Sequence, residues 1–186
     1  MNLSTFKTNF NGGTRANRFR VKGAVGKIGT AVDHNFHIVS SFIPDVNHMV
    51  FDVNAFGRKL FIPGDREYLP WSITVLDDIG TTTGANGANP SHMWKLFSTW
   101  HNNINAHTTN IPEGANDTAH LAYKQNWAIE QLSLNGDTVI KSFSLMGCWP
   151  RIVGDIDLNM ARRNILNKFN VIMVYDSIEI AGVTPT

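Results

Sequence analysis

Residues 56–78 read FGRKLFIPGDREYLPWSITVLDD, and this stretch decides the fold class. Residues 59–62 predict a short strand, and the Pro-Gly pair at 63–64 predicts a turn. A charged patch follows at residues 65–67. Apolar residues then alternate with polar ones over residues 71–75, which predicts a second strand with one buried face. The stretch contains no catalytic pattern, which favours a function that depends on surfaces and not on reactive groups.

The bulk composition indicates one domain of moderate size. The chain has 186 residues, of which 42% are apolar and 17% are charged. Soluble domains carry about 25% charged residues, so this low charge is consistent with a surface that other subunits cover, although polar Asn and Thr also replace charge. A net charge of +1 gives no strong attraction to nucleic acid or membranes.

Targeting signals are not expected in this sequence. The first ten residues lack the basic and apolar regions of a signal peptide. No apolar run approaches the ~20 residues that span a bilayer. The single cysteine, Cys148, excludes an internal disulfide framework. We therefore expect a soluble protein that is made in a cytoplasm and does not bind membranes.

The first half of the chain predicts further strands. Residues 18–22 alternate basic and apolar side chains, and residues 30–43 are expected to form a longer strand. A Gly-rich turn at residues 23–29 separates them. Residues 45–54 are expected to form an irregular connection.

One helix is predicted at about residues 90–105. Asn89 is placed to cap it and Pro90 to occupy its first position, where a proline loses no hydrogen bond. An apolar stripe recurs at helical spacing. Its members are Met93, Leu96, Phe97, Trp100 and Ile104. Polar loops at 80–88 and 105–118 flank this helix.

The last third of the chain predicts strands again. Residues 127–134 and 138–146 flank Asn135-Gly136, a hairpin signal that usually requires positive φ at both turn positions. Residues 169–175 form a closing strand that is apolar on both faces, so it is expected to be covered on both sides. The fold class is therefore mainly β (α+β): an antiparallel β-sandwich or barrel with one flanking α-helix.

Three sequence patterns that could indicate a chemical site do not meet the requirements of such a site. The glycines of residues 23–30 lack the spacing of a phosphate loop. His34 and His37 lie three apart and face opposite sides of a strand, so they cannot share a metal. Cys148 lacks a local partner and is interpreted as a buried hydrophobe. We expect no catalytic residue, no cofactor and no metal site.

A basic segment near the N-terminus has two interpretations. It can contact a phosphate backbone or an acidic protein neighbour, and the second is at least as well supported because no array of aromatic residues accompanies it. Its basic members are Arg15, Arg18, Arg20, Lys22 and Lys27, with Phe19 among them.

Several segments, in this order, resemble the tail tube proteins of contractile-tailed bacteriophages. The most specific parts are the Gly-Asp-Arg segment and the Gly-x-Trp-Pro segment, which occur in register on either side of the helix. The resemblance extends from about residue 14 to 176. Its segments are TRANRFRV (14–21), GRKLFIPGDR (57–66), WSITVLDD (71–78), GCWPRIVGDIDL (147–158) and the strand at 169–175.

The resemblance implies a structural subunit of the virion tail that is assembled in the host cytoplasm. Such proteins form homohexameric rings, and the rings stack helically into the inner tube through which the genome passes during contractile ejection. The implied partners are other copies of the chain, the tail sheath protein, baseplate proteins and tube initiator or terminator proteins. The tape measure protein and DNA occupy the lumen transiently.

The resemblance also implies an organisation and an interface. Residues 1–186 form one domain, with a mobile arm at about 1–14 and a ring-stacking loop at about 45–66 that is mobile in the monomer and orders on stacking. In that loop Phe56 is the expected apolar anchor, and the charges set register. The expected interface residues are Phe51, Asn54, Phe56, Gly57, Arg58, Lys59, Gly64, Asp65 and Arg66.

Alternatives remain open. Residues 159–164 are more basic than the family leads us to expect. The chain could be a tube initiator or terminator, or the inner tube of a phage-like contractile injection system. A small-molecule-binding β-barrel belongs to a different class, and it would be a monomer with an apolar pocket. An enzyme is the least favoured class.

Overall fold

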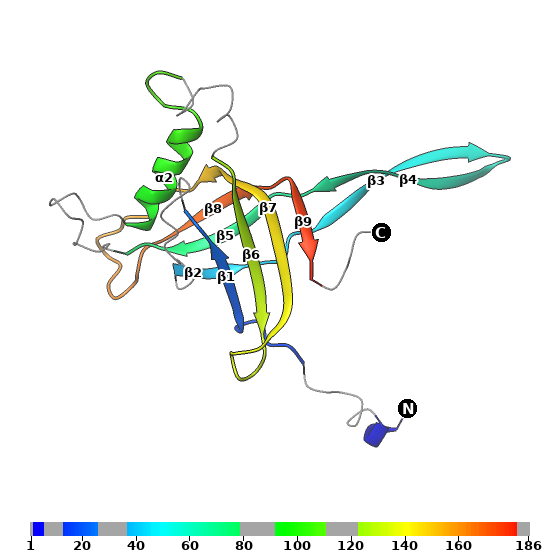
Figure 1. Cartoon of the computed structure of the whole chain (residues 1–186), viewed down its shortest axis with the longest axis horizontal. Coiled ribbons are helices and arrows are strands. Elements are labelled where there is room, and N and C mark those ends of the chain that lie inside the picture. Colours follow the sequence, from blue (N-terminus) through cyan, green and yellow to red (C-terminus); the bar gives the residue numbers. More distant parts are fainter. Residues whose placement is uncertain (1, 6–12, 26–36, 79–91, 111–122, 182–186) are drawn as a thin grey trace.

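The computed structural model describes residues 2–5, 13–25, 37–78, 92–110 and 123–181. Within them, one main helix and nine strands follow one another along the chain (Figure 1). The elements are β1 (Phe19–Gly23), β2 (Ile38–Ser41), β3 (Val46–Ala55), β4 (Arg58–Tyr68), β5 (Trp71–Leu76), α2 (Met93–Ile104), β6 (Gln125–Leu132), β7 (Val139–Val153), β8 (Lys168–Val174) and β9 (Ser177–Ile180). No helix in these residues is long and apolar enough to cross a membrane.

Two antiparallel sheets share the long strand β7. Its first part lies between β6 and β9, and β1 pairs with the far side of β6. Its last part pairs with β8, which continues through β5 to β2. The chain changes sheet near Gly147, which has a φ of 68°. The expected mainly antiparallel β fold with one flanking helix is confirmed.

The core lies between these two sheets. Trp71 of β5 meets Trp127 of β6 edge to face, with ring centroids 5.9 Å apart. The alternation expected for residues 71–75 is confirmed, because every second side chain is buried. In the closing strand the inward face is buried, whereas on the outward face Asn170 is exposed and only Ile172 and Val174 are half-buried, so the expected cover on both sides is incomplete within the subunit. The periodicity of these two strands therefore located the core correctly.

The helix contributes three side chains to this core. Met93, Phe97 and Trp100 are buried, and Phe97 packs against Phe169 with ring centroids 6.0 Å apart. Trp100 stacks on Trp127 at 6.4 Å. The helix begins later than predicted.

Its N-cap is His92, whose side chain accepts a hydrogen bond from the Lys95 amide. Asn89 is therefore not the cap; it lies outside the described residues, as does Pro90.

The β6–β7 turn differs from the predicted one. Only Gly136 has a positive φ, of 83°, and Asn135 does not. The Gly136 amide donates to the Ser133 carbonyl at 3.0 Å, and the Ser133 amide donates to the Thr138 carbonyl at 2.8 Å. The connection is thus longer than two residues, so it does not need the positive φ at both positions that a two-residue turn needs.

The region before β5 contradicts two predictions. Residues 45–54 are not irregular, and Pro63-Gly64 is not a turn, because β3 and β4 form one long hairpin with nine paired positions. A register shift lies between the pairs His48–Arg66 and Val50–Pro63, and because its extra residue is in β4, it interrupts the alternation of that strand. Among the described residues β4 pairs with β3 alone, and an edge strand tolerates a proline. The long strand expected at 30–43 is described only at β2, since residues 30–36 lie outside the described ranges.

Candidate functional site

The β3–β4 hairpin projects from the sandwich, and it carries many exposed apolar side chains (Figure 1). An isolated two-stranded ribbon is marginally stable in water, and large exposed apolar patches mark interaction sites. The apolar side chains concerned are Val46, Met49, Val50, Phe51, Val53, Phe56, Leu60, Phe61 and Ile62. This composition is typical of a surface that interacts with a partner.

One face of the hairpin is apolar. Phe51 lies opposite Ile62, and Val53 lies opposite Leu60. Residues directly opposite one another in an antiparallel pair project to the same side, and alternate residues share that side. These four side chains therefore form one continuous apolar strip, which we call the apolar face.

The other face of the hairpin mixes apolar and charged groups. Asp52 lies opposite Phe61, and Asn54 lies opposite Lys59. The Lys59 ammonium is 3.1 Å from the Asp52 carboxylate, and both side chains are more than half exposed. An exposed pair of this kind contributes little stability. Its main effect is to place a positive and a negative charge next to one another on this face of the hairpin.

The hairpin ends in a strained two-residue turn. Phe56 has a φ of 51° and Gly57 a φ of 76°, and the flanking Ala55 and Arg58 are paired. Positive φ at both central residues is the type I′ pattern. Glycine adopts it freely, whereas a bulky residue in the left-handed region costs about 1–3 kcal/mol. The Phe56 side chain is nevertheless fully exposed, so nothing within the described subunit offsets that strain.

Phe51 and Gly64 fit together on neighbouring strands. A Cβ added to Gly64 would lie 2.6 Å from Cε2 of Phe51 and 3.0 Å from the Met49 carbonyl oxygen. The absence of a side chain at Gly64 therefore lets the Phe51 ring lie flat across the ribbon. Gly64 shapes the exposed surface near the base of the hairpin.

All nine sequence-predicted interface residues lie on this hairpin, but they form two groups. Asn54, Phe56, Gly57, Arg58 and Lys59 are at the tip, whereas Phe51, Gly64, Asp65 and Arg66 lie nearer the base.

Arg58 and Asp65 are seven residues apart in one strand, which is about 23 Å. They therefore cannot contact one another within one hairpin. Neither they nor Arg66 form an ion pair within the described part of the chain.

The sequence reasoning missed most of the apolar face. Val53, Leu60 and Ile62 were not selected, because residues 45–54 were expected to be irregular and the Pro-Gly pair was expected to end the strand. The signal that could have found them is the alternation of Phe51, Val53 and Ala55. That alternation becomes visible when the strand is counted from the turn at Phe56-Gly57.

The sequence raised Cys148 and the histidines His34 and His37 as candidates for chemistry. Cys148 is fully buried, and burial raises the pKa of its thiol to about 12, which keeps it protonated and unreactive. No cluster of three or more His, Cys, Asp or Glu residues that could hold a metal occurs among the described residues. His37 contacts Asp78 at 3.2 Å, and His34 lies outside the described residues.

The basic N-terminal segment finds an acidic partner in its own chain. The Arg20 Nε donates to Glu130 at 2.9 Å, and the Lys22 ammonium donates to the same carboxylate at 2.8 Å. Burial alone would raise the pKa of Glu130, but the hydrogen bonds and charges of Lys22 and Arg20 outweigh it and hold that pKa below its usual value. Two of the five basic residues thus form ion pairs within the sheet of their own subunit.

A second exposed apolar segment lies between β7 and β8. Leu158, Met160, Ile165 and Leu166 are largely or fully exposed. The basic character noted at residues 159–164 is partly neutralised, because Arg162 pairs with Asp157 at 2.6 Å. We call residues 154–167 the β7–β8 connection.

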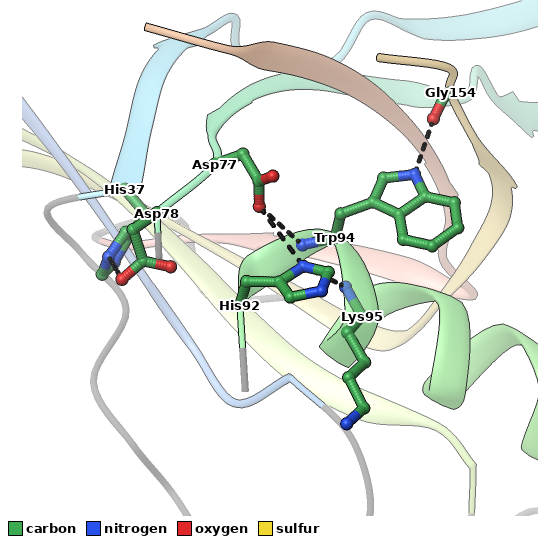
Figure 2. Close-up of polar contacts among 7 residues, drawn as sticks. All are labelled: His37, Asp77, Asp78, His92, Trp94, Lys95 and Gly154. Carbon is green, nitrogen blue, oxygen red and sulfur yellow. Dashed lines mark hydrogen bonds and ion pairs between the residues drawn. The ribbon is translucent and has the colours of Figure 1, made fainter. Parts of the chain in front are cut away.

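The start of this connection is fixed by the helix (Figure 2). The Trp94 indole donates to the Gly154 carbonyl at 3.2 Å, while the Trp94 amide donates to Asp77 at 3.2 Å. The ring of His92 lies 3.6 Å from Asp77 and caps the helix through the Lys95 amide. These contacts join the end of β5, the beginning of α2 and the beginning of the β7–β8 connection.

No family model matches the chain, but curated proteins are similar to it. The tail tube protein gp19 of Enterobacteria phage T4 is 26% identical over 124 residues, which cover 67% of this chain and 68% of that protein. The tail tube protein of Serratia phage KSP90 is 28% identical over 120 residues, which cover 64% of this chain and 59% of that protein.

Solved structures show the same fold. A chain of the anti-feeding prophage baseplate matches with a TM-score of 0.63 at 13% identity, covering 95% of this chain and all of that one. A chain from the sheath-tube complex of an extracellular contractile injection system matches with a TM-score of 0.56 at 16% identity, covering 98% and 99%. Since this sequence similarity is low, these matches concern the fold. The chain is thus similar in sequence to phage tail tube proteins, and it shares the fold of chains from the anti-feeding prophage baseplate and from an extracellular contractile injection system.

Proposed function

We propose that the chain is a structural subunit of a phage tail tube, in which homohexameric rings stack into the tube that the genome passes through. The curated relatives are named tail tube proteins, which supports the role in a tube. The single observation in the chain itself that carries the proposal is the exposed, largely apolar β3–β4 hairpin. The role is structural and not enzymatic, and the protein belongs to the virion tail.

Ring formation would use the open edges of the two sheets. Within the described residues β1, β2 and β9 each pair with one neighbouring strand only. Edge strands present unpaired amide and carbonyl groups, which a neighbouring copy can satisfy. A heterologous contact of this kind closes into a ring when the rotation between copies fits.

Ring stacking would use the hairpin. Stacked rings repeat a head-to-tail contact along an open filament, so one end of the subunit must fit the opposite end of the next. The hairpin extends along the long axis of the molecule (Figure 1), and it places Phe56 and Arg58 farthest from the core. In this role Phe56 is the apolar anchor and the charges of Arg58, Lys59, Asp65 and Arg66 set the register.

Other tail proteins would contact the assembled tube. The similar solved chains come from a baseplate, a sheath-tube complex and a tube terminating cap. By analogy we propose contacts with the tail sheath protein, the baseplate and initiator or terminator proteins, while the tape measure protein and DNA occupy the lumen transiently.

The assembly state of the purified protein tests this function. Negative-stain microscopy of wild-type protein should show tubes of indefinite length, or stacked rings with six-fold views. Rings that never stack would instead favour an initiator or terminator. Dispersed monomers at high concentration would contradict the proposal.

A further inference from the structure

We propose that the hairpin tip of one copy docks into a hollow formed by the β7–β8 connection of the next copy along the tube. The inference rests on the proposed function, because it needs copies that stack head to tail. It goes further by naming the surface that receives the hairpin.

The two surfaces lie at opposite ends of the same pair of strands. Trp71, at the start of β5 next to the hairpin, pairs with Met173. At the other end of β5, Leu76 pairs with Lys168, and the Asp77 amide donates to the Asn167 carbonyl at 3.0 Å. Figure 1 shows the hairpin at one end of the long axis and the orange β7–β8 connection at the other. A translation along this axis therefore brings the tip of one copy toward the connection of the next.

The receiving surface is concave, and its lining mixes apolar side chains with the polar or charged Asp157, Asn159, Arg162, Asn167 and Lys168. It contains a hollow of about 310 Å³ whose lining includes Leu158, Ile165 and Leu166. These three side chains are 65–79% exposed. A fully exposed aromatic side chain at a hairpin tip and the exposed apolar side chains of the hollow are both stabilised when they exclude water from one another. Phe56 is the matching anchor, and its strained backbone holds the ring away from its own subunit.

The start of the connection is held by β8 and the helix before any partner arrives. The Gly154 amide donates to Asn170 at 2.7 Å, and the Trp94 indole holds the Gly154 carbonyl (Figure 2). The Asp157–Arg162 ion pair joins two of the residues that line the hollow. A preorganised acceptor loses less conformational entropy on binding.

Each surface carries one charge without an ion pair that could meet its opposite on the next copy, although Lys168 also lines the hollow. At the tip, Lys59 is paired with Asp52, which leaves Arg58 as a cation without an ion pair in the described subunit. Asp155 is exposed at the start of the connection, and it too has no ion pair among the described residues. An Arg58–Asp155 contact between copies would orient the Phe56 ring toward the hollow.

Site-directed crosslinking tests the pairing. Phe56→Cys and Leu166→Cys are combined in one chain, and assembled tubes are treated with a short bis-maleimide. Cys148 is fully buried and does not interfere. The matched control combines Phe56→Cys with Leu134→Cys, which is similarly exposed, at 57% against 66%, but lies in the β6–β7 turn. Asn54→Cys replaces Phe56→Cys if loss of the ring stops assembly.

The expected result is a ladder of covalent oligomers for the first pair and at most traces for the control. Tubes that form normally but crosslink equally in both pairs, or in neither, would overturn the acceptor assignment while leaving the tube function intact. If the wild type forms no tubes at all, the proposed function fails instead.

A charge exchange gives an independent readout. Arg58→Asp and Asp155→Arg should each raise the concentration needed for assembly, by about tenfold. The double variant should recover most of that loss, because the exchanged charges attract again. Effects that simply add in the double variant would contradict the contact between Arg58 and Asp155.

Discussion

The Phe51 ring covers Gly64 on the opposite strand of the hairpin, so closely that a Cβ on Gly64 would lie 2.6 Å from Cε2 of the ring. Gly64→Ala should force the ring into another rotamer at a cost of about 1 kcal/mol. We expect a roughly fivefold higher critical concentration for assembly. The melting temperature of the unassembled subunit should change by less than about 2 °C, because Phe51 is 58% exposed and free to turn.

A double variant separates this contact from general damage. Once Phe51→Ala has removed the ring, Gly64→Ala should have little additional effect on assembly, as measured by sedimentation. An undiminished effect of Gly64→Ala in that background would mean that its cause is not the ring.

Phe56 is expected to lower the local stability of the hairpin and to promote assembly. Asn tolerates positive φ better than Phe, so Phe56→Asn should relieve strain and slow amide hydrogen exchange in β3 and β4. The same change removes the exposed ring, so tubes should form poorly or not at all. Assembly at the wild-type concentration would show that Phe56 is not an anchor.

The apolar face should matter more for assembly than an exposed apolar residue elsewhere. Leu60→Asp places a charge on this face, where burying a leucine is worth about 1.5–3 kcal/mol. We expect the critical concentration to rise by at least tenfold. Ile140→Asp in β7 is the matched control, with 49% exposure against 55% for Leu60. Equal effects of the two changes in a pelleting assay would contradict a special role of the hairpin in assembly.

The aromatic core should determine subunit stability. Phe97 is fully buried and contacts Trp100, Trp127 and Phe169. Phe97→Ala should therefore lower the free energy of unfolding by about 3–5 kcal/mol, measured by denaturant titration of unassembled protein. Leu134→Ala, at an exposed position, should change it by less than about 0.5 kcal/mol. A small effect at Phe97 would mean that the helix does not complete the core.

Glu130 should make stability depend on pH. Its pKa is lowered in the folded state, so its ion pairs stabilise the fold above the ordinary pKa of a glutamate. That contribution is lost as the pH falls through the lowered folded value. Glu130→Gln should therefore cost about 1–2 kcal/mol at neutral pH, and the difference from wild type should vanish in acid.

Exposed Glu179→Gln, at the end of β9, is the control, and it should behave as wild type at every pH. A cost of Glu130→Gln that persists unchanged in acid would argue against the ion pairs with Arg20 and Lys22.

The sequence predicted the parts of the fold that are buried on one side. Trp71, Ile73 and Val75 alternate strictly because their strand has one face in the core, and the helix stripe is regular for the same reason. These patterns are strong because a shift by one residue would expose every core side chain.

The β3–β4 hairpin could not be predicted from such periodicity. Its side chains are exposed in the subunit, so no internal core imposes a period on them. The bulge between Pro63 and Arg66 breaks the alternation of β4, and Phe56-Gly57 does not have the usual Asn-Gly composition of a two-residue turn. The interface residues were therefore proposed from the resemblance, whereas their division into a tip and a base required the structure.

High-resolution cryo-electron microscopy of purified tubes tests the central claim most directly. The account predicts that the β3–β4 hairpin of each subunit is buried between successive rings, with the Phe56 ring excluded from solvent. A tube in which the hairpin lies exposed on the outer wall or in the lumen, with the rings joined by other elements, would contradict it.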